Sequence, residues 1–337
     1  MGKKVFLLRD ADVSGKKLLW DAGLEVVVAK GTGESAWIEE MQRGQPAAIL
    51  TRADRVSAAM MDACPGLKAI GKQGIGLDCI DMDVATQRGI QVVYAPVSNV
   101  NAAAEHTMFM IKACARRFSY VDRVFRGGNF DVRYGLHNTF ELSGRTLGLI
   151  GCGHVGSRVA QKASLGFGMK VIGYDTFLSK EQMAELGVEK YDDKFEALKA
   201  ADVVIVQMPL IEGVTNNTIA KAELDAMKPT ALLINCSRGE IVNEPDLCEA
   251  LKSGSIAGAG LDVFWNEPTH IDDEILHCPN VIASPHSAAQ TREAVIKMAK
   301  MCVNGCLAVV DGKKWPYVAD KAVYDHPKWA GKEWAEV

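Results

Sequence analysis

Residues 146–175 read TLGLIGCGHVGSRVAQKASLGFGMKVIGYD and predict a strand, a glycine-rich turn, a helix and a second strand. Gly151 permits the tight turn, Gly153 lets the backbone approach a pyrophosphate, and Gly156 lets the helix pack closely on the strand. Asp175 ends the second strand, 175 − 156 = 19 residues after the last glycine, where a carboxylate can hold adenosine ribose hydroxyls. The stretch predicts a βαβ unit that binds a dinucleotide.

Glycine-rich turns are common, so a structural turn with a coincidental aspartate is the alternative. The apolar strand before the glycines and the helix SRVAQKASLGF after them favour nucleotide binding. The carboxylate of Asp175 would repel a 2′-phosphate, and the following residues, Thr-Phe-Leu-Ser, include no arginine to neutralise one. The pattern therefore predicts NAD as the cofactor in preference to NADP.

The length, net charge and apolar runs of the chain limit the classes of protein to which it can belong. With 337 residues the chain is long enough for two domains. The formal net charge of −4 gives no electrostatic reason to expect nucleic acid or an anionic membrane as partner. No apolar run reaches the roughly 18 residues of a spanning helix. The start, MGKKVFLLRDADVSG, has too short an apolar core for a signal peptide and predicts a first strand, so we expect a cytoplasmic protein.

The nine cysteines are scattered through apolar segments and predict free thiols in a reducing compartment. Cys302 and Cys306 could share one helix face, but no nearby His or Cys completes a zinc site. We predict no metal.

Short apolar runs alternate with segments of helical spacing along the chain. Strands are predicted at residues 4–8, 24–29, 47–51, 67–71, 90–95, 146–151, 170–175, 201–209, 231–237, 257–264 and 280–286. One long helical pattern runs from about Asn101 to the glycine pair at 127–128, and a last helix covers 291–310 before a polar tail. Strands that alternate with helices predict parallel sheets with right-handed crossovers.

Three ionisable residues follow successive strands of the second series. Arg238 follows ALLINCS, Glu267 follows GLDVF, and His286 follows NVIAS. Taken singly, the histidine could be a cap or loop residue and the glutamate a solvated turn residue. Because ligands bind at the carboxyl ends of parallel strands, we expect the three side chains to converge there.

Such a set suits hydride transfer to a 2-keto acid. A planar guanidinium can clamp the substrate carboxylate and polarise its carbonyl. A histidine can give the carbonyl oxygen a proton, and a neighbouring carboxylate can orient the ring and favour its protonated form.

Residues 45–310 resemble the D-isomer-specific 2-hydroxyacid dehydrogenase family, which includes phosphoglycerate, glyoxylate/hydroxypyruvate and D-lactate dehydrogenases. Besides the glycine fingerprint, the matching motifs are Lys72-Gln-Gly-Ile-Gly-Leu-Asp78, Asn99 with Ala104-Glu105-His106-Thr107, Asn235-Cys-Ser-Arg238-Gly, Leu261-Asp-Val-Phe, Asn266-Glu-Pro and Ser284-Pro-His286.

The resemblance implies an α/β protein in which a Rossmann cofactor domain, with a doubly wound parallel sheet, is inserted into a flavodoxin-like α/β substrate domain. The expected parts are residues 1–102 and 290–337 for the substrate domain and 103–289 for the NAD-binding domain. Hinges are expected near residues 101–103 and 288–291. Closure about them would exclude water from the hydride.

The resemblance also implies site roles. Arg238 would bind the substrate carboxylate and carbonyl, and His286 with Glu267 would be the acid–base pair. Asp262 would contact the nicotinamide carboxamide. The implied cofactor contacts are Thr107, Gly151, Gly153, His154, Val155, Gly156, Asp175, Met208, Pro209, Cys236, Ser237, Arg238, Asp262 and His286.

Substrate contacts are implied at Ile75, Gly76 and Asn99. Arg52 and Lys72 flank the expected pocket and could bind a phosphate or a second carboxylate. The alternative is that each is a strand-end charge paired with an acidic neighbour. The acid itself is left open, with 3-phosphoglycerate, glyoxylate and hydroxypyruvate as examples.

Two positions depart from the family pattern. Gln207 stands where many relatives have His, and Phe130 stands where Trp is common in the arm that makes the family's dimer contact. A homodimer is implied, and no regulatory domain is expected after Val337. The predicted function is an NAD-dependent D-2-hydroxyacid dehydrogenase, and the alternative is an NAD(H)-sensing corepressor-like binding protein.

Overall fold

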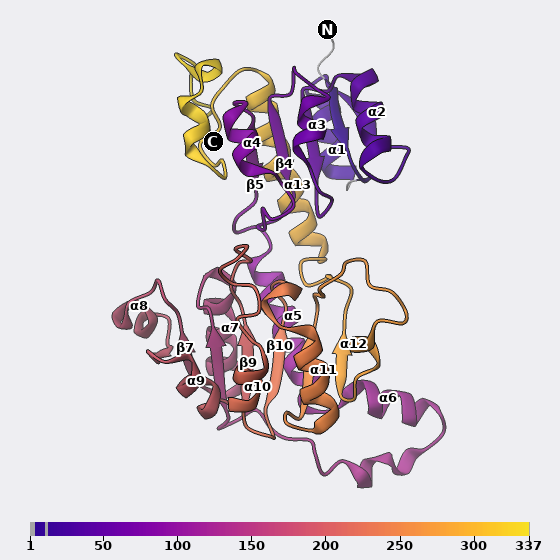
Figure 1. Cartoon of the computed structure of the whole chain (residues 1–337), viewed down its shortest axis with the longest axis vertical. Coiled ribbons are helices and arrows are strands. Elements are labelled where there is room, and N and C mark those ends of the chain that lie inside the picture. The colour runs from indigo at the N-terminus through magenta and orange to yellow at the C-terminus, as the bar shows by residue number, and fades with distance from the viewer. Residues whose placement is uncertain (1–3, 11–12, 337) are drawn as a thin grey trace. The chain divides into compact units, whose positions relative to one another are not determined.

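Two parallel sheets organise the chain, whose computed structural model describes residues 4–10 and 13–336. They belong to two units (Figure 1): unit 1 comprises Met1–Asn99 and Gln290–Val337, and unit 2 comprises Val100–Ala289. Unit 2 is thus inserted into unit 1. The first division precedes α5 (Val100–Ala115), whereas the expected boundary between residues 102 and 103 falls inside this continuous helix.

The sheet of unit 1 has five parallel strands in the order β2-β1-β3-β4-β5, the flavodoxin-like order. Its strands are β1 (Lys4–Leu7), β2 (Glu25–Val28), β3 (Ala48–Thr51), β4 (Ala69–Lys72) and β5 (Gln91–Tyr94). Its helices are α1 (Val13–Asp21), α2 (Glu34–Gly44), α3 (Ala58–Asp62), α4 (Met82–Gln87) and α13 (Arg292–Val310).

Both faces of this sheet are covered, as the apolar, β-branched strands require. Ile70 packs in one core with Met41 of α2 and Met60 of α3. Its neighbour Gly71 faces α13, because a Cβ atom there would lie 2.8 Å from Cys306 Sγ. Alternating residues of one strand therefore contact helices on opposite faces.

The C-terminal tail packs on β5. Val318 forms a bridge with Val93, and the indole N–H of Trp329 donates to the carbonyl of Gly89 at 2.8 Å. The tail contains two short 3-10 helices, η3 (Lys321–Asp325) and η4 (Pro327–Trp329). The tail, expected to be polar, thus also buries a tryptophan beside the residues that lead into β5.

Unit 2 has a seven-stranded parallel sheet in the order β12-β11-β10-β9-β6-β7-β8. The order reverses at β6, as in doubly wound Rossmann sheets, so the predicted fold class is confirmed. Its strands are β6 (Thr146–Ile150), β7 (Lys170–Tyr174), β8 (Glu189–Lys190), β9 (Val203–Val206), β10 (Leu232–Asn235), β11 (Gly258–Leu261) and β12 (Val281–Ala283). Besides α5, unit 2 contains the helices α6 (Phe118–Arg126), α7 (His154–Phe167), α8 (Lys180–Glu185), α9 (Lys194–Ala200), α10 (Lys221–Ala226), α11 (Glu244–Ser253) and α12 (Glu274–His277). It also contains the short 3-10 helices η1 (Phe130–Gly135) and η2 (Gly239–Ile241).

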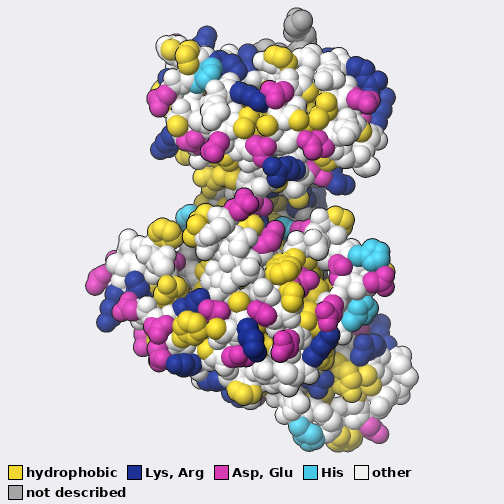
Figure 2. All heavy atoms as spheres, viewed as in Figure 1, with side chains coloured by type: hydrophobic (Ala, Val, Ile, Leu, Met, Phe, Trp, Pro, Cys, Tyr) yellow, Lys and Arg dark blue, Asp and Glu magenta, His cyan; other side chains and the backbone are white. Residues whose placement is uncertain are grey.

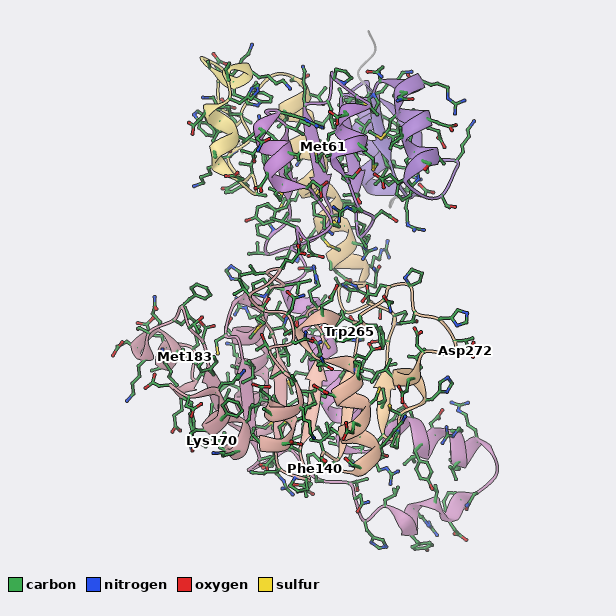
Figure 3. The ribbon with its side chains drawn as sticks, in the orientation of Figure 1. Met61, Phe140, Lys170, Met183, Trp265 and Asp272 are labelled. Atoms are coloured by element: carbon green, nitrogen blue, oxygen red, sulfur yellow. The ribbon has the colours of Figure 1, made fainter. Side chains whose placement is uncertain are left out.

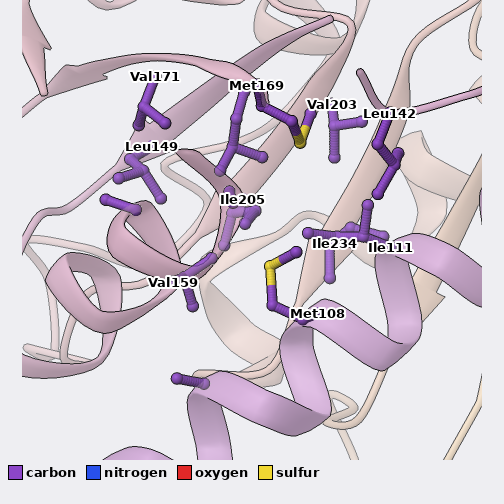
Figure 4. Packing of buried hydrophobic residues seen from close by; sticks show 14 of the residues in the cluster. Met108, Ile111, Leu142, Leu149, Val159, Met169, Val171, Val203, Ile205 and Ile234 are labelled. Carbon is purple, nitrogen blue, oxygen red and sulfur yellow. The ribbon is translucent and has the colours of Figure 1, made fainter. Parts of the chain in front are cut away.

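The core of unit 2 joins α5 and α7 to one face of the sheet. Figure 4 shows Met108 and Ile111 of α5 and Val159 of α7 packed with strand residues such as Ile205 and Ile234. In the two helices the apolar residues recur with the helical period, so they lie on the side of each helix that faces the sheet.

The long helical pattern after Asn101 is two helices in the structure. Arg117 lies between α5 and α6 with φ 48, in the left-handed region, which ends the first helix. The prediction of one helix was wrong because polar and apolar residues keep a helical period through this break.

Candidate functional site

The carboxyl ends of β10, β11 and β12 lie side by side. Asn235 pairs in register with Leu261, and Leu261 with Ala283, the last residues of the three strands. Arg238, Glu267 and His286 follow these strands. The structure therefore places all three residues at one edge of the unit 2 sheet.

The loops after β10 and β11 touch. A Cβ atom on Gly239 would lie 2.0 Å from the backbone of Phe264, so only glycine fits next to Arg238 without moving the loop that carries Glu267. The indole N–H of Trp265, labelled in Figure 3, donates to the carbonyl of Val242 at 2.7 Å and holds the same two loops together.

His286 and Glu267 form a hydrogen-bonded pair. His286 Nδ1 lies 2.6 Å from Glu267 Oε2, and the other carboxylate oxygen accepts the backbone N–H of Phe264 at 3.1 Å. The two side chains are 39% and 33% exposed, so ligands can reach the ring. The backbone of His286 has φ 49 and donates to the carbonyl of Asp262 at 2.7 Å. Such strained residues concentrate at functional sites.

Arg238 is half-buried, and its backbone is fixed by Asn235. The Asn235 side-chain amide donates to the Arg238 carbonyl at 2.8 Å, and its oxygen accepts from the N–H and hydroxyl of Ser237. One guanidinium nitrogen donates to the Ser237 carbonyl at 2.7 Å. Asn235 thus shapes the turn that presents the guanidinium.

Asp262 is fully buried behind this edge. Its carboxylate accepts from the Ser284 hydroxyl at 2.5 Å and from the backbone N–H groups of Ser287 and Ala288 at 2.8 Å each. His106 of α5 lies 2.9 Å from the Ser284 hydroxyl and 3.4 Å from the carboxylate. Burial opposes ionisation most strongly, but His106 and these donors together lower the pKa of Asp262.

The glycine turn after β6 has the backbone that a pyrophosphate needs. Cβ atoms on Gly151 and Gly156 would lie 2.4 Å and 2.6 Å from backbone oxygens, whereas one on Gly153 would meet nothing within 4 Å. α7 starts at His154, which is exposed and directly follows Gly153. The first N–H groups of a helix have no partner within the helix, so those of α7 are available to a ligand in the open space beside Gly153.

Asp175 lies beside this turn. One oxygen accepts the N–H of Cys152 at 2.9 Å, and the other accepts the N–H groups of Phe177 and Leu178 at 2.8 and 3.1 Å. Carboxylate oxygens so oriented have lone pairs left for ribose hydroxyls. The turn, the helix start and this carboxylate fit a dinucleotide.

The remaining expected cofactor residues have different environments. Thr107 is buried and its hydroxyl donates to the Ala103 carbonyl at 2.8 Å. Cys236 and Ser237 are buried at the end of β10, and burial raises the pKa of Cys236 to about 12. Val155 in the first turn of α7, and Met208 and Pro209 after β9, are at least partly exposed.

The expected substrate residues belong to unit 1. Thr51 pairs in register with Lys72, and Arg52 follows at the carboxyl end of β3. Burial lowers the pKa of Arg52, and in the described part of the chain no ion pair or hydrogen bond of this side chain is seen. Its acidic neighbour Asp54 pairs instead with Arg9 at 2.8 Å.

Ile75 and Gly76 lie in the turn after β4, and Asn99 precedes α5. Asn99 Oδ1 is buried without a hydrogen-bond partner among the described residues.

Sequence reasoning assigned no role to His106 or Ser284 and noted Gln207 only as a departure from the family pattern, and the structure places all three at or beside this edge. His106 and Ser284 are 178 residues apart, so no local pattern joins them. Ser284 and Gln207 directly follow the strands β12 and β9, and this position alone could have indicated that they lie at the edge where ligands bind.

Cys302 and Cys306 are buried in α13, and Cys302 Sγ donates to the Lys72 carbonyl at 2.8 Å. Within residues 4–10 and 13–336 no group of three His, Cys, Asp or Glu side chains could hold a metal ion. In the same residues no helix has the length and apolarity needed to cross a membrane.

Residues 108–288 match the family model described as D-isomer specific 2-hydroxyacid dehydrogenase, NAD binding domain. A glyoxylate reductase of Thermococcus litoralis is 34% identical over 331 residues, which are 96% of this chain and 98% of that protein. A D-3-phosphoglycerate dehydrogenase of Archaeoglobus fulgidus is 37% identical over 292 residues, 86% of this chain. This chain spans about half the length of that relative, 54%.

Among solved structures, that of the TT0316 protein from Thermus thermophilus has a TM-score of 0.85 at 30% identity and covers 94% of this chain and 100% of its own. The apo D-mandelate dehydrogenase of Rhodotorula graminis has a TM-score of 0.83 at 26% identity, with 95% and 98% covered.

Proposed function

Because the chain belongs to the D-isomer specific 2-hydroxyacid dehydrogenase family, we propose that it interconverts a 2-keto acid and a D-2-hydroxy acid with NAD. The observation that carries this proposal is the His286–Glu267 pair, 2.6 Å apart, on strand ends next to that of Arg238. When bound, the nicotinamide supplies or accepts the hydride.

The geometry suggests the role of each side chain. Glu267 engages Nδ1 of His286, so Nε2 is the ring nitrogen left to give a proton to the carbonyl oxygen during reduction. Glu267 orients the ring and stabilises the imidazolium. Arg238 can bind the substrate carboxylate with two parallel hydrogen bonds and draw charge from the adjacent carbonyl.

The substrate proposal rests on Arg52. A half-buried guanidinium with no partner among the described residues suits a second anionic group on the acid, as in 3-phosphoglycerate. Some relatives are named D-3-phosphoglycerate dehydrogenase, whereas others are named glyoxylate reductase. Glyoxylate, which has no second anion, is the second candidate.

We propose a homodimer that forms through the arm of unit 2, residues 118–145. α6 has no buried residue, and Phe118, Phe125, Phe130 and Tyr134 are 53–67% exposed. Figure 2 shows hydrophobic side chains at the surface at the lower right, where Figure 1 places α6. A cavity of about 1130 Å³ between arm residues such as Tyr120 and body residues such as Ile282 could take the partner's arm.

The decisive test is His286→Ala, followed by the absorbance of NADH at about 340 nm with a panel of 2-keto acids. Losing the proton donor should lower kcat by about 10²–10⁴-fold while NADH still binds. His270→Ala removes an exposed histidine of the preceding loop and should leave kcat unchanged.

Full activity of His286→Ala would mean that the proton comes from another group. If the unaltered protein binds NADH tightly but turns over no acid in the panel, the NAD(H)-sensing function is the correct one.

A further inference from the structure

Gln207 directly follows β9, the strand next to the nucleotide turn. Its backbone N–H donates to the carbonyl of Ile150, the last residue of β6, at 2.9 Å. Its backbone oxygen would lie 2.4 Å from a Cβ atom on Gly151, and its Cγ atom would lie 3.8 Å from one on Gly156. Both the backbone and the side chain of Gln207 are therefore packed along the glycine turn.

The side-chain carbonyl oxygen of Gln207 is buried without a hydrogen-bond partner in the described part of the chain. Three side-chain atoms there share this condition, and Gln207 Oε1 is the one in unit 2. More than about nine in ten buried polar groups in native proteins are hydrogen-bonded. An acceptor left unpaired beside a ligand-binding turn points to a donor on the ligand.

Strand order indicates which part of a dinucleotide lies there. Along the sheet the order is β10-β9-β6-β7, so β9 lies between the strand that leads to Arg238 and the nucleotide strand β6. Asp175, expected at the adenosine ribose, follows β7 on the other side of β6. Gln207 therefore stands on the nicotinamide side of the pyrophosphate turn.

We propose that Gln207 is a cofactor-binding residue whose Oε1 accepts a hydrogen bond from a hydroxyl of the nicotinamide-side ribose. A neutral carbonyl oxygen suits a hydroxyl donor and repels phosphate oxygens. This assignment rests on the proposed NAD-dependent function.

The test is Gln207→Met, which keeps the length of the side chain and removes the acceptor. Calorimetric titration should show Kd values for NADH and for ADP-ribose about 3- to 10-fold larger, as expected for one neutral hydrogen bond. The Kd for ADP, which lacks the second ribose, should not change. The ligand-free variant should unfold at a higher urea concentration, because an unpaired buried oxygen has been removed.

Gln161→Met, an exposed change in α7, is the matched control and should alter none of these values. Gln207→Leu also lacks an acceptor and serves if the methionine variant does not fold. Unchanged NADH affinity, or equal weakening of ADP and ADP-ribose, would overturn the assignment. If the unaltered protein fails to bind NADH, the proposed function fails together with it.

Discussion

His286 combines an unfavourable backbone conformation with hydrogen bonds from both its backbone and its ring. His286 occupies the left-handed region at φ 49, yet its N–H donates to Asp262 and its ring contacts Glu267. Arg52 shows the opposite condition, since its charge is half-buried and none of the described residues pairs with it. A charge left in this state favours a ligand as its partner.

We expect Arg52→Ala to separate the candidate substrates. Loss of a charge-assisted hydrogen bond should raise KM for 3-phosphoglycerate about 10- to 100-fold, and KM for glyoxylate should change less than about 3-fold. Steady-state assays with both acids measure the difference. Arg55→Ala, which removes an exposed guanidinium paired with Asp81, is the control. Equal losses with both acids would remove Arg52 from substrate selection.

At the scale of elements, one buried carboxylate joins a helix to two strand ends. Asp262 follows β11, Ser284 follows β12, and His106 belongs to α5. The hydrogen bonds stabilise ionised Asp262, whose pKa is lowered despite burial. A carboxyl group with a lowered folded-state pKa stabilises the fold above its ordinary pKa, and this contribution disappears as the pH falls through the lowered value.

Asp262→Asn should therefore reduce stability in a pH-dependent way. Above about pH 5 we expect the free energy of unfolding to fall by about 2–4 kcal/mol, since several charge-assisted hydrogen bonds are lost. The difference from the unaltered protein should shrink as the pH falls below about 4. Urea unfolding of the ligand-free protein at several pH values measures this. Asp272→Asn, at an exposed carboxylate, should show no such trend, and a constant difference for Asp262→Asn would contradict the argument.

The whole molecule is built from an interrupted unit and an inserted one. The chain returns after Ala289 and completes unit 1 with α13 and a tail that packs on β5. Unit 2 contains the edge of the sheet where Arg238, Glu267 and His286 lie, and it also contains the arm, whose aromatic side chains are exposed. Phe125 and Phe130 contact each other edge to face with ring centroids 6.0 Å apart. An exposed aromatic cluster of this kind is typical of an interface.

The double variant Phe125→Glu/Phe130→Glu should weaken the proposed dimer by about 30-fold or more, because charges replace aromatic anchors. Sedimentation at several protein concentrations gives the association constant. Leu165→Glu alters an exposed apolar residue of α7 and should leave it unchanged. If the double variant associates as strongly as the unaltered protein, the interface does not involve these two residues. If the unaltered protein is monomeric, the proposed homodimer is wrong.

Much of the fold was predictable because its signals are local. Strand runs such as residues 146–151 and the glycine spacing around Gly153 depend on neighbours in sequence, and the βαβ unit, the parallel sheets and the family followed from them. The break at Arg117 was missed because it changes one backbone conformation without changing the pattern. The burial of Trp329 was missed because its partner, Gly89, is 240 residues away.

The amino-acid sequence by itself determined the two sheets and which polar residues follow their strands, since both are set by short-range periodicity and turn chemistry. Only the tertiary structure decided that the expected His286–Glu267 pair meets through Nδ1, that His106 contacts Asp262, and that the Gln207 oxygen is buried without a partner in the described residues. Such contacts join loops far apart in the chain, and they depend on the register in which neighbouring strands pair.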